Sequence, residues 1–283
     1  GFSDTGQLWG NPLFAWERMA EDGYAWWIER ISYQLDFYDI LRIDHFRGFD
    51  SYYAIPAGAS TAAGGRWQPG PGKAFFSALE AKLGPCPIVA EDLGFLTPSV
   101  YRLLSDTGYP GMKVLQFAFD SRDGGGSLYQ PHNYTPHCVA YVGTHDNDTA
   151  LGWLRTADAG DVALAREYLH LDVAEGEGWG MMRAIWSSVA DLSIVTMQDV
   201  LGLGSDARIN TPSTLGGNWC WRALPGYATE QVARRLHRAM ELYGRLPKAE
   251  VAARDAALNA EAAAEAWAVQ SDARVQSSEE TTR

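Results

Sequence analysis

The sequence predicts an α/β fold in which helices alternate with parallel strands, and two observations predict it. The first is a change in the spacing of apolar residues. Within 26–38 the residues Trp27, Ile31, Leu35 and Tyr38 recur at helical spacing, and a short β-prone run follows at 40–44. The second is that this order of helix and strand repeats along the chain. Strands separated by helices indicate a parallel sheet built from βα units.

The other elements follow from the same two periods. Besides 26–38, we expect helices at 74–83, 99–107 and 181–190; strands are expected at 40–44, 88–91, 113–119, 139–143 and 194–197. Pro and Gly break both periods at 69–72 and 124–126, which marks these as loops. Gly202 and Gly204 predict a plain turn, because the rest of a phosphate-binding fingerprint is absent. A last amphipathic helix is expected after Thr229, its N-cap.

Composition excludes several classes of function. With 283 residues, 46% of them hydrophobic, the chain can bury a sizeable core, and its net charge of -12 without a basic cluster predicts no nucleic-acid partner. The apolar runs fall far short of the ~20 residues of a membrane-spanning helix. The three cysteines are far apart and form no Cys-x-x-Cys motif, so neither a disulfide framework nor a thiolate zinc site is expected. A reducing, cytoplasmic location fits, and no secretory signal is expected because the opening residues have neither a basic region nor an apolar run.

Three acidic residues follow three of the predicted strands. Asp44, Glu91 and Asp146 each come at a strand end, and the carboxyl ends of parallel strands form the ligand site in α/β sheets and barrels. Side chains alternate along a strand, so Arg42 and Asp44 point the same way. A guanidinium beside Asp44 favours the ionised carboxylate that a nucleophile needs.

Glu91 differs from Asp44 in its surroundings, because it follows an apolar run and adjoins other acids, which favours the protonated form of a proton donor. One ionised and one protonated acid, ~5 to 5.5 Å apart, form the pair of a retaining glycosidase. Asp146 is expected to act as a third acid that binds sugar hydroxyls. His45 and His145 are expected to supply further polar contacts to hydroxyls.

Other interpretations of these residues stay open at this point. An Asp at a strand end is often a helix N-cap or a ligand for loop N–H groups, and we expect that role for Asp92 and Asp148. Metal is a competing interpretation, since Asp44, Asp146 and the two neighbouring histidines are possible ligands, but no His-x-His or His-Glu-x-x-His motif is present. A Ser-His-Asp hydrolase is disfavoured because no Gly-x-Ser-x-Gly motif occurs.

Aromatic residues are abundant, with eleven Trp and thirteen Tyr. Flat rings serve as platforms for the apolar faces of pyranose units in sugar-binding grooves. We expect Trp9, Tyr52 and Phe117 near such a groove and most other aromatic residues in the core.

At these residues the chain resembles the 4-alpha-glucanotransferases, also called amylomaltases or disproportionating enzymes. The matching segments, which lie within about residues 1–226, are TGQLWGNP at 5–12, LRIDHFRGF at 41–49, VAEDLG at 89–94, GMKVLQF at 111–117 and GTHDNDT at 143–149. The resemblance implies a (β/α)8 barrel without a metal or organic cofactor. It also implies a retaining double displacement on α-1,4-glucans and maltooligosaccharides, in which a glucan segment passes to the 4-hydroxyl of an acceptor sugar.

The resemblance also implies a role for each matching residue. By position, Asp44 corresponds to the nucleophile, Glu91 to the acid/base and Asp146 to the transition-state stabiliser. The implied substrate-binding residues are Arg42, His45 and His145 at the cleavage subsite, Gln7 and Trp9 on a loop beside the acceptor, and Asn210 in a segment that lines the pocket. The sequence after Asn210 departs from the family pattern at 211–214.

Five strands are predicted here, whereas the barrel has eight, so the family's first three strands are expected before Gly1. On this interpretation residues 1–246 form the C-terminal portion of the barrel, which needs its N-terminal half. Residues 247–283 form an Ala/Glu-rich tail that is partly helical or disordered. Two alternatives stay open: an α-amylase-like retaining hydrolase and a non-catalytic glucan-binding fragment.

Overall fold

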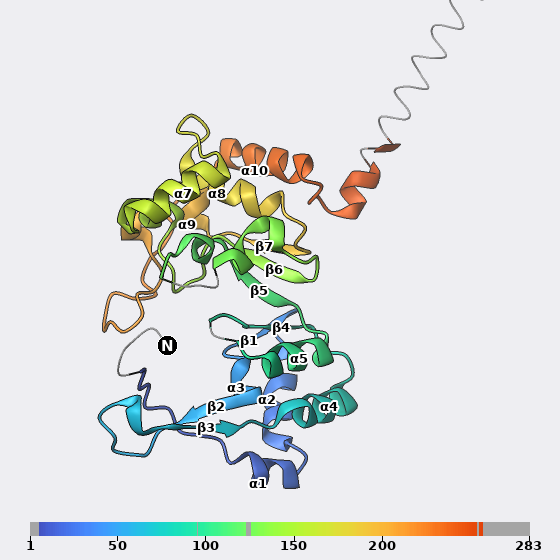
Figure 1. Ribbon diagram of the computed structural model, residues 1–283. Helices are drawn as coiled ribbons and strands as arrows, with labels where there is room; N and C mark the ends of the chain where they lie inside the picture. Colours follow the sequence, from blue (N-terminus) through green and yellow to red (C-terminus); the bar gives the residue numbers. More distant parts are fainter. Residues whose placement is uncertain (1–5, 95, 123–125, 254, 257–283) are drawn as a thin grey trace, which may run out of the picture. The chain divides into compact units, whose positions relative to one another are not determined.

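The computed structural model describes residues 6–94, 96–122, 126–253 and 255–256. The chain forms two compact units, Gly1–Arg222 and Ala223–Arg283, and each is described here by itself. The first unit contains all of the strands and all of the predicted site residues (Figure 1).

The first half of this unit holds the helix and strand order that the sequence predicts, with an added antiparallel ribbon. Its elements are α1 (Trp16–Glu21), α2 (Ala25–Leu35), β1 (Leu41–Ile43), α3 (Arg47–Asp50), β2 (Ser51–Ala54), β3 (Arg66–Pro69), α4 (Gly72–Leu83), β4 (Ile88–Ala90) and α5 (Pro98–Thr107). β2 and β3 form the antiparallel ribbon, which the sequence analysis does not predict.

The second half continues with β5 (Gly111–Val114), β6 (Cys138–Tyr141), α6 (Ala150–Thr156), α7 (Ala159–Leu169), α8 (Glu177–Trp186), β7 (Leu192–Ile194) and α9 (Met197–Val200). Short 3-10 turns lie between these elements, among them Leu115–Phe119 directly after β5 and Ser205–Ala207 after α9.

The strands other than β2 and β3 pair in parallel, which confirms the α/β class. β1 pairs with β4, and β5, β6 and β7 form a second sheet in that order. The register of the first pair places Ile43 opposite Ala90, so the two strands end at the same level. A backbone hydrogen bond of 2.9 Å from the Ala90 N–H to the Pro110 carbonyl links the end of β4 to the start of β5.

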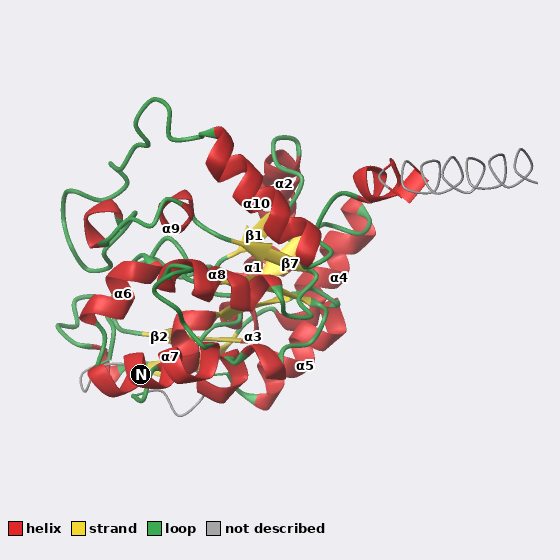
Figure 2. Ribbon diagram, turned by 90° about the horizontal axis from the view of Figure 1, so that it is seen from above, coloured by secondary structure: helices red, strands yellow, loops and turns green. Residues whose placement is uncertain are grey.

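Helices cover the first pair of strands from one side. Phe75, Phe76 and Leu79 of α4, with Val100 and Leu103 of α5, are buried in one cluster with Ile43, Ile88 and Ala90. Figure 2 shows α4 and α5 side by side at the margin of this unit, with strands further inward. Because their apolar side chains fill the side of the strands that faces these helices, the polar residues that follow β1 and β4 are left at the strand ends.

Two of the predicted strands are displaced toward the C-terminus, because β5 is Gly111–Val114 rather than 113–119 and β7 is Leu192–Ile194 rather than 194–197. Residues 115–119 form a 3-10 turn, and in it Gln116 Nε2 donates to the Asp148 carbonyl over 2.8 Å. Residue 197 begins α9, whose N-cap Thr196 accepts a hydrogen bond from the Asp199 N–H. In both places a polar side chain satisfies loop backbone groups, and the strand ends there.

The second unit contains α10 (Glu230–Leu242), and its N-cap is Thr229, as predicted. Thr229 Oγ1 accepts a 3.2 Å hydrogen bond from the Val232 N–H. Residues 248–253 are helical, and the predicted tail beyond 256 lies outside the described residues. No helix within the described ranges is long and apolar enough to span a bilayer.

Candidate active site

The ends of β1 and β4 are joined through Glu91. The Glu91 N–H donates to the Ile43 carbonyl over 2.9 Å, and the Glu91 carbonyl accepts from the Phe46 N–H over 3.0 Å. The Glu91 side chain accepts two further N–H groups, from His45 at 2.7 Å and from Leu93 at 3.0 Å. Asp44 lies between the residues that bind Glu91, so the nucleophile and acid/base candidates occupy adjacent positions at one sheet edge.

Asp44 itself projects into solvent, with 77% of its side chain exposed, and forms an ion pair with Arg42. Arg42 Nη1 lies 2.7 Å from Asp44 Oδ1, as the strand alternation predicts. His45 follows in the left-handed backbone region, with a φ of 48°. A non-glycine residue in this region is strained. The hydrogen bonds that Glu91 makes with Ile43, His45 and Phe46 hold the backbone in this turn.

Arg42 also reaches across the strands. Its Nε lies 3.3 Å from Sδ of Met112 on β5, and its charge acts on Tyr141 on β6, whose pKa is nevertheless raised because burial outweighs it. A cavity of about 120 Å³ is lined by residues from four strands or their ends, including Arg42, Met112, Tyr141, Ile194 and His145. The side chains of β1, β5, β6 and β7 therefore face a common space.

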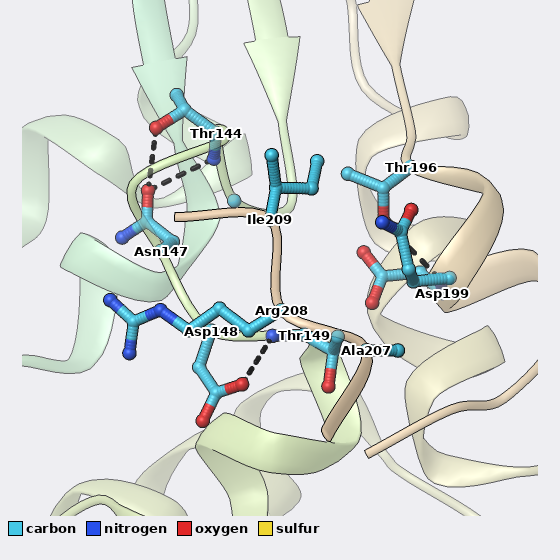
Figure 3. Close-up of a pocket in the computed structure, with 11 residues that line it drawn as sticks. Thr144, Asn147, Asp148, Thr149, Thr196, Asp199, Ala207, Arg208 and Ile209 are labelled. Carbon is cyan, nitrogen blue, oxygen red and sulfur yellow. Dashed lines mark hydrogen bonds between the residues drawn. The ribbon is translucent and has the colours of Figure 1, made fainter. Parts of the chain in front are cut away.

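Asp146 lies in the loop after β6, where neighbouring residues hold it. Its Oδ2 lies 3.4 Å from His145 Nε2, and its Oδ1 accepts a 2.6 Å hydrogen bond from Nδ2 of Asn210. Asn147 Oδ1 accepts from both the N–H and the Oγ1 of Thr144 over 2.9 Å each, which closes the turn (Figure 3). The turn places His145 and Asp146 at its tip, where about half of the Asp146 side chain is exposed.

Comparisons with known proteins identify the family of this chain. A family model described as 4-alpha-glucanotransferase matches residues 1–226. The chain belongs to this family. The 4-alpha-glucanotransferase of Clostridium butyricum is 49% identical over 247 residues, which are 86% of this chain and 50% of that protein. The enzyme of the same name from Thermus thermophilus is 46% identical over 252 residues, 87% of this chain and 50% of that protein.

A solved structure, the amylomaltase from Streptococcus agalactiae in complex with acarbose, is similar in fold and sequence. It has a TM-score of 0.82 and 41% sequence identity, and the match covers 87% of this chain and 50% of that one. The chain therefore spans about half the length of the relatives it matches.

The remaining predicted substrate-binding residues lie in three places. Asn210 is part of the Asp146 cluster. Phe117 follows β5 and packs edge-on against Tyr129, with 5.5 Å between ring centroids. The other three lie elsewhere: Trp9 donates to Gln7 over 3.3 Å, and Tyr52 is on the antiparallel ribbon. Among the described residues, no hydrogen bond or ion pair joins Gln7, Trp9 or Tyr52 to the three carboxylates.

Two residues of the site, Trp219 and Arg208, are not predicted from the sequence. Trp219 packs its ring on His145, with 5.2 Å between centroids, and 66% of the residue is exposed. Arg208 binds the Asp146 carbonyl. Neither follows a strand or recurs at a regular spacing, and the only signals are the unusual 208–212 segment and the Gly216-Gly217 pair before Trp219.

Asp92 and Asp148 have structural roles, as predicted. Asp92 is 7% exposed and accepts a 2.6 Å hydrogen bond from the Met112 N–H, and burial raises its pKa despite that bond. Asp148 Oδ2 accepts from Ser205 Oγ over 2.7 Å. Among the described residues, no three His, Cys, Asp or Glu side chains gather as a metal site would require.

Proposed function

We propose that this chain carries the catalytic residues of a 4-alpha-glucanotransferase that acts on α-1,4-glucans and maltooligosaccharides by a retaining double displacement. The observation that carries the proposal is the junction of β1 and β4, where Asp44 and Glu91 follow strands in register and are linked through His45. Neighbouring parallel strands lie ~4.8 Å apart, which suits the ~5 to 5.5 Å between the carboxyl groups of a retaining pair.

In the first step an Asp44 oxygen attacks the anomeric carbon, and the bond from that carbon to the leaving oxygen breaks. Glu91 gives its proton to the leaving oxygen, so a glycosyl ester and a shortened glucan result. In the second step the 4-hydroxyl of an acceptor attacks the same carbon, Glu91 takes its proton, and the ester bond to Asp44 breaks. Net transfer therefore consumes no water.

The neighbouring groups suit these two steps. Arg42 Nη1, 2.7 Å from Asp44 Oδ1, keeps the Asp44 carboxylate oriented for attack. Each Glu91 oxygen accepts one N–H group, and a carboxyl group offers about four acceptor positions, so positions remain for the proton and the leaving oxygen. Asp146 and His145 face the sugar as hydroxyl ligands, and Asp146 offsets the positive charge that develops on the ring.

We further propose that the parallel strands are part of a (β/α)8 barrel. The support is that β1, β5, β6 and β7 contribute side chains to one cavity, as strands that curve around an interior do. In the proposal, residues 1–246 belong to the barrel and 247–283 to a separate tail. A segment corresponding to the first half of the relatives supplies the other strands and part of the donor groove, and would cover Leu192 and Ile194, which are 37% and 42% exposed.

We also propose a reducing, cytoplasmic location. Cys86 and Cys220 are free thiols in the structure, and Cys138 is buried in β6, where it packs as a small apolar side chain.

The function is tested by incubating the complete protein with maltotriose. Transfer predicts free glucose together with a ladder of longer maltooligosaccharides. Shorter sugars alone would favour the hydrolase alternative, and retained starch binding without turnover would favour the non-catalytic one. The glucose and ladder products must both be absent in an Asp44→Asn variant for the assignment of the nucleophile to hold.

A further inference from the structure

The segment that follows α9 holds the loop that carries Asp146. Ser205 Oγ donates to Asp148 Oδ2 over 2.7 Å, and the Asn210 N–H donates to the His145 carbonyl over 3.1 Å. These bonds join residues about sixty positions apart in the sequence. The segment 205–210 therefore runs along the 145–148 loop and contacts both of its ends.

Arg208 lies at the centre of this contact. Its Nε donates to the Asn210 carbonyl over 2.8 Å, and its Nη2 donates to the Asp146 carbonyl over 2.5 Å. Figure 3 shows the Arg208 side chain extended along the loop beside Asp148. One planar guanidinium thus fixes the backbone of two residues whose side chains also meet, since Asn210 Nδ2 donates to Asp146 Oδ1 over 2.6 Å.

We propose that Arg208 is a positioning residue that sets the Asp146 carboxylate for the transition state, acting through the main chain of Asp146 and through Asn210. The proposal rests on the proposed function, because it assigns Asp146 to the glucan transfer site. It differs from the role implied by the resemblance for Asn210, whose side-chain amide is engaged by Asp146 rather than presented to a sugar. Neither Arg208 nor this linkage is implied by the matching motifs.

The chemistry of arginine explains why this residue type is required. A guanidinium presents donors along fixed directions in one plane, so it can hold two carbonyl groups at a set angle to each other. A lysine ammonium at this position is a single point donor on a flexible stem and cannot hold both carbonyls in that geometry. Without the tie to Asp146, the Asn210 amide loses its alignment with Oδ1 and the carboxylate gains rotational freedom.

The test compares Arg208→Lys with wild type in the complete enzyme, using the rate of α-1,4 bond cleavage in maltotriose. We expect kcat to fall by roughly 10- to 100-fold, the range for one misplaced hydrogen bond to a charged group, and KM to stay within about threefold. The control is Arg166→Lys. Arg166 makes a similar fork, from its Nε and Nη2 to Glu177 at 2.6 and 3.2 Å, but it links α7 to α8 away from the strand ends. Its kcat should stay within about twofold of wild type.

Two further measurements separate positioning from loss of folding. Arg208→Ala should recover part of its kcat when guanidinium ion is added at millimolar concentration, and Arg166→Ala should not respond. The loss of kcat in Arg208→Lys and in Asn210→Ala should be strongly non-additive in the double variant, because both act on Asp146.

A crystal structure of Arg208→Lys provides a reading that does not depend on turnover. We expect Asn210 Nδ2 to lie beyond hydrogen-bond distance of Asp146 Oδ1. A retained contact, a kcat within twofold of wild type, or a fall in kcat matched by an equal rise in KM would each overturn the role of Arg208. If the wild-type enzyme were inactive on maltotriose but Asn210 were displaced from Asp146 in the Arg208→Lys structure, the proposed function alone would be overturned.

Discussion

The main-chain N–H of His45 donates to Oε2 of Glu91 over 2.7 Å, which ties the residue after one catalytic candidate to the side chain of the other. The backbone bond from Glu91 to Ile43 acts on the other side of Asp44. Asp44 cannot shift along β1 without disturbing the carboxylate of Glu91. We therefore treat the two strand ends as one rigid arrangement, in which the separation of the two acids is set by main-chain hydrogen bonds.

Replacing Glu91 with Gln tests this arrangement and the proton-donor role together. The amide has one acceptor oxygen, so it cannot accept from both His45 and Leu93 as the carboxylate does. We expect a loss of about 1 to 3 kcal/mol in the free energy of unfolding and a fall of roughly 10³-fold or more in transfer from maltotriose. Denaturant unfolding and product analysis provide the two measurements.

An activated donor separates the roles of the two acids. The fluoride of α-maltosyl fluoride leaves with little help from a proton, so the Glu91→Gln variant should still release fluoride in the first step. Asp44→Asn should not, because the nucleophile is changed. Equal fluoride release by both variants would contradict the assignment of Asp44 and Glu91 to different roles.

Strand positions and the acids that follow them could be predicted from the sequence, because both depend on local patterns. Apolar runs such as 88–90 end in a polar residue, and parallel pairing brings such ends together without further information. The same reasoning places Arg42 beside Asp44, and the structure has that contact.

The rest depends on contacts between distant segments, which local patterns do not encode. Arg208 and Trp219 join the site only because the chain after α9 returns to the loop after β6. The β2–β3 ribbon has no clear signal in the sequence, because Ser51–Ala54 and Arg66–Pro69 are short and without clear alternation. The apolar content of residues 115–119 predicts a strand, whereas in the structure the buried Gln116 donates from its side-chain amide to the Asp148 carbonyl and the strand ends before it.

Trp219 is predicted to bind sugar through its exposed ring. The ring centroid lies 5.2 Å from that of His145, at an interplanar angle of 35°. The backbone N–H of Trp219 donates to the Ile209 carbonyl over 2.7 Å, which fixes the position of the Trp219 backbone. We expect Trp219→Ala to raise KM for maltotriose by about 3- to 10-fold, the worth of one aromatic contact, with a smaller change in kcat. Tyr33→Ala removes a ring of similar exposure, 61% against 66%, from α2 and should leave KM unchanged. A KM for Trp219→Ala equal to that of wild type would exclude this role.

Stability should depend on pH through Asp92, whose pKa is raised chiefly by burial. A raised pKa means that the folded state holds the proton more tightly than the unfolded state does. The contribution of Asp92 is therefore fully present below its unfolded pKa of about 3.9 and is lost as pH rises through the folded value. We expect wild type to lose stability relative to Asp92→Asn over this window, measured by denaturant unfolding at a series of pH values.

Asp120 supplies a control of opposite sign. Hydrogen bonds from Arg122 at 2.6 and 2.8 Å lower the pKa of Asp120, so its contribution is present above the unfolded pKa and is lost as pH falls through the folded value. Wild type should accordingly lose stability relative to Asp120→Asn on acidification. If both pairs of curves ran parallel across the pH series, neither carboxyl group would contribute as described.

Gly111 is predicted to be irreplaceable for packing at the start of β5. A Cβ built on Gly111 would lie 2.4 Å from Oδ2 of Asp92 and 2.7 Å from its Cγ, and Asp92 is held in place by the Met112 N–H. We expect Gly111→Ala to lower the free energy of unfolding by about 1 to 3 kcal/mol, the usual effect of overpacking. Gly64→Ala is the matched control, because its Cβ would meet nothing within 4 Å and its backbone needs no positive φ; it should stay within about 0.5 kcal/mol of wild type.

The cause of the Gly111 effect can be isolated with a second substitution. Asp92→Ala removes the carboxylate that the new methyl group would strike, at the cost of the hydrogen bond to Met112. If the clash is the cause, the double variant Gly111→Ala and Asp92→Ala should be more stable than the sum of the two single effects predicts. Strictly additive losses would instead place the effect of Gly111 in the backbone, and Asp92 would then have no part in keeping β4 and β5 at their present spacing.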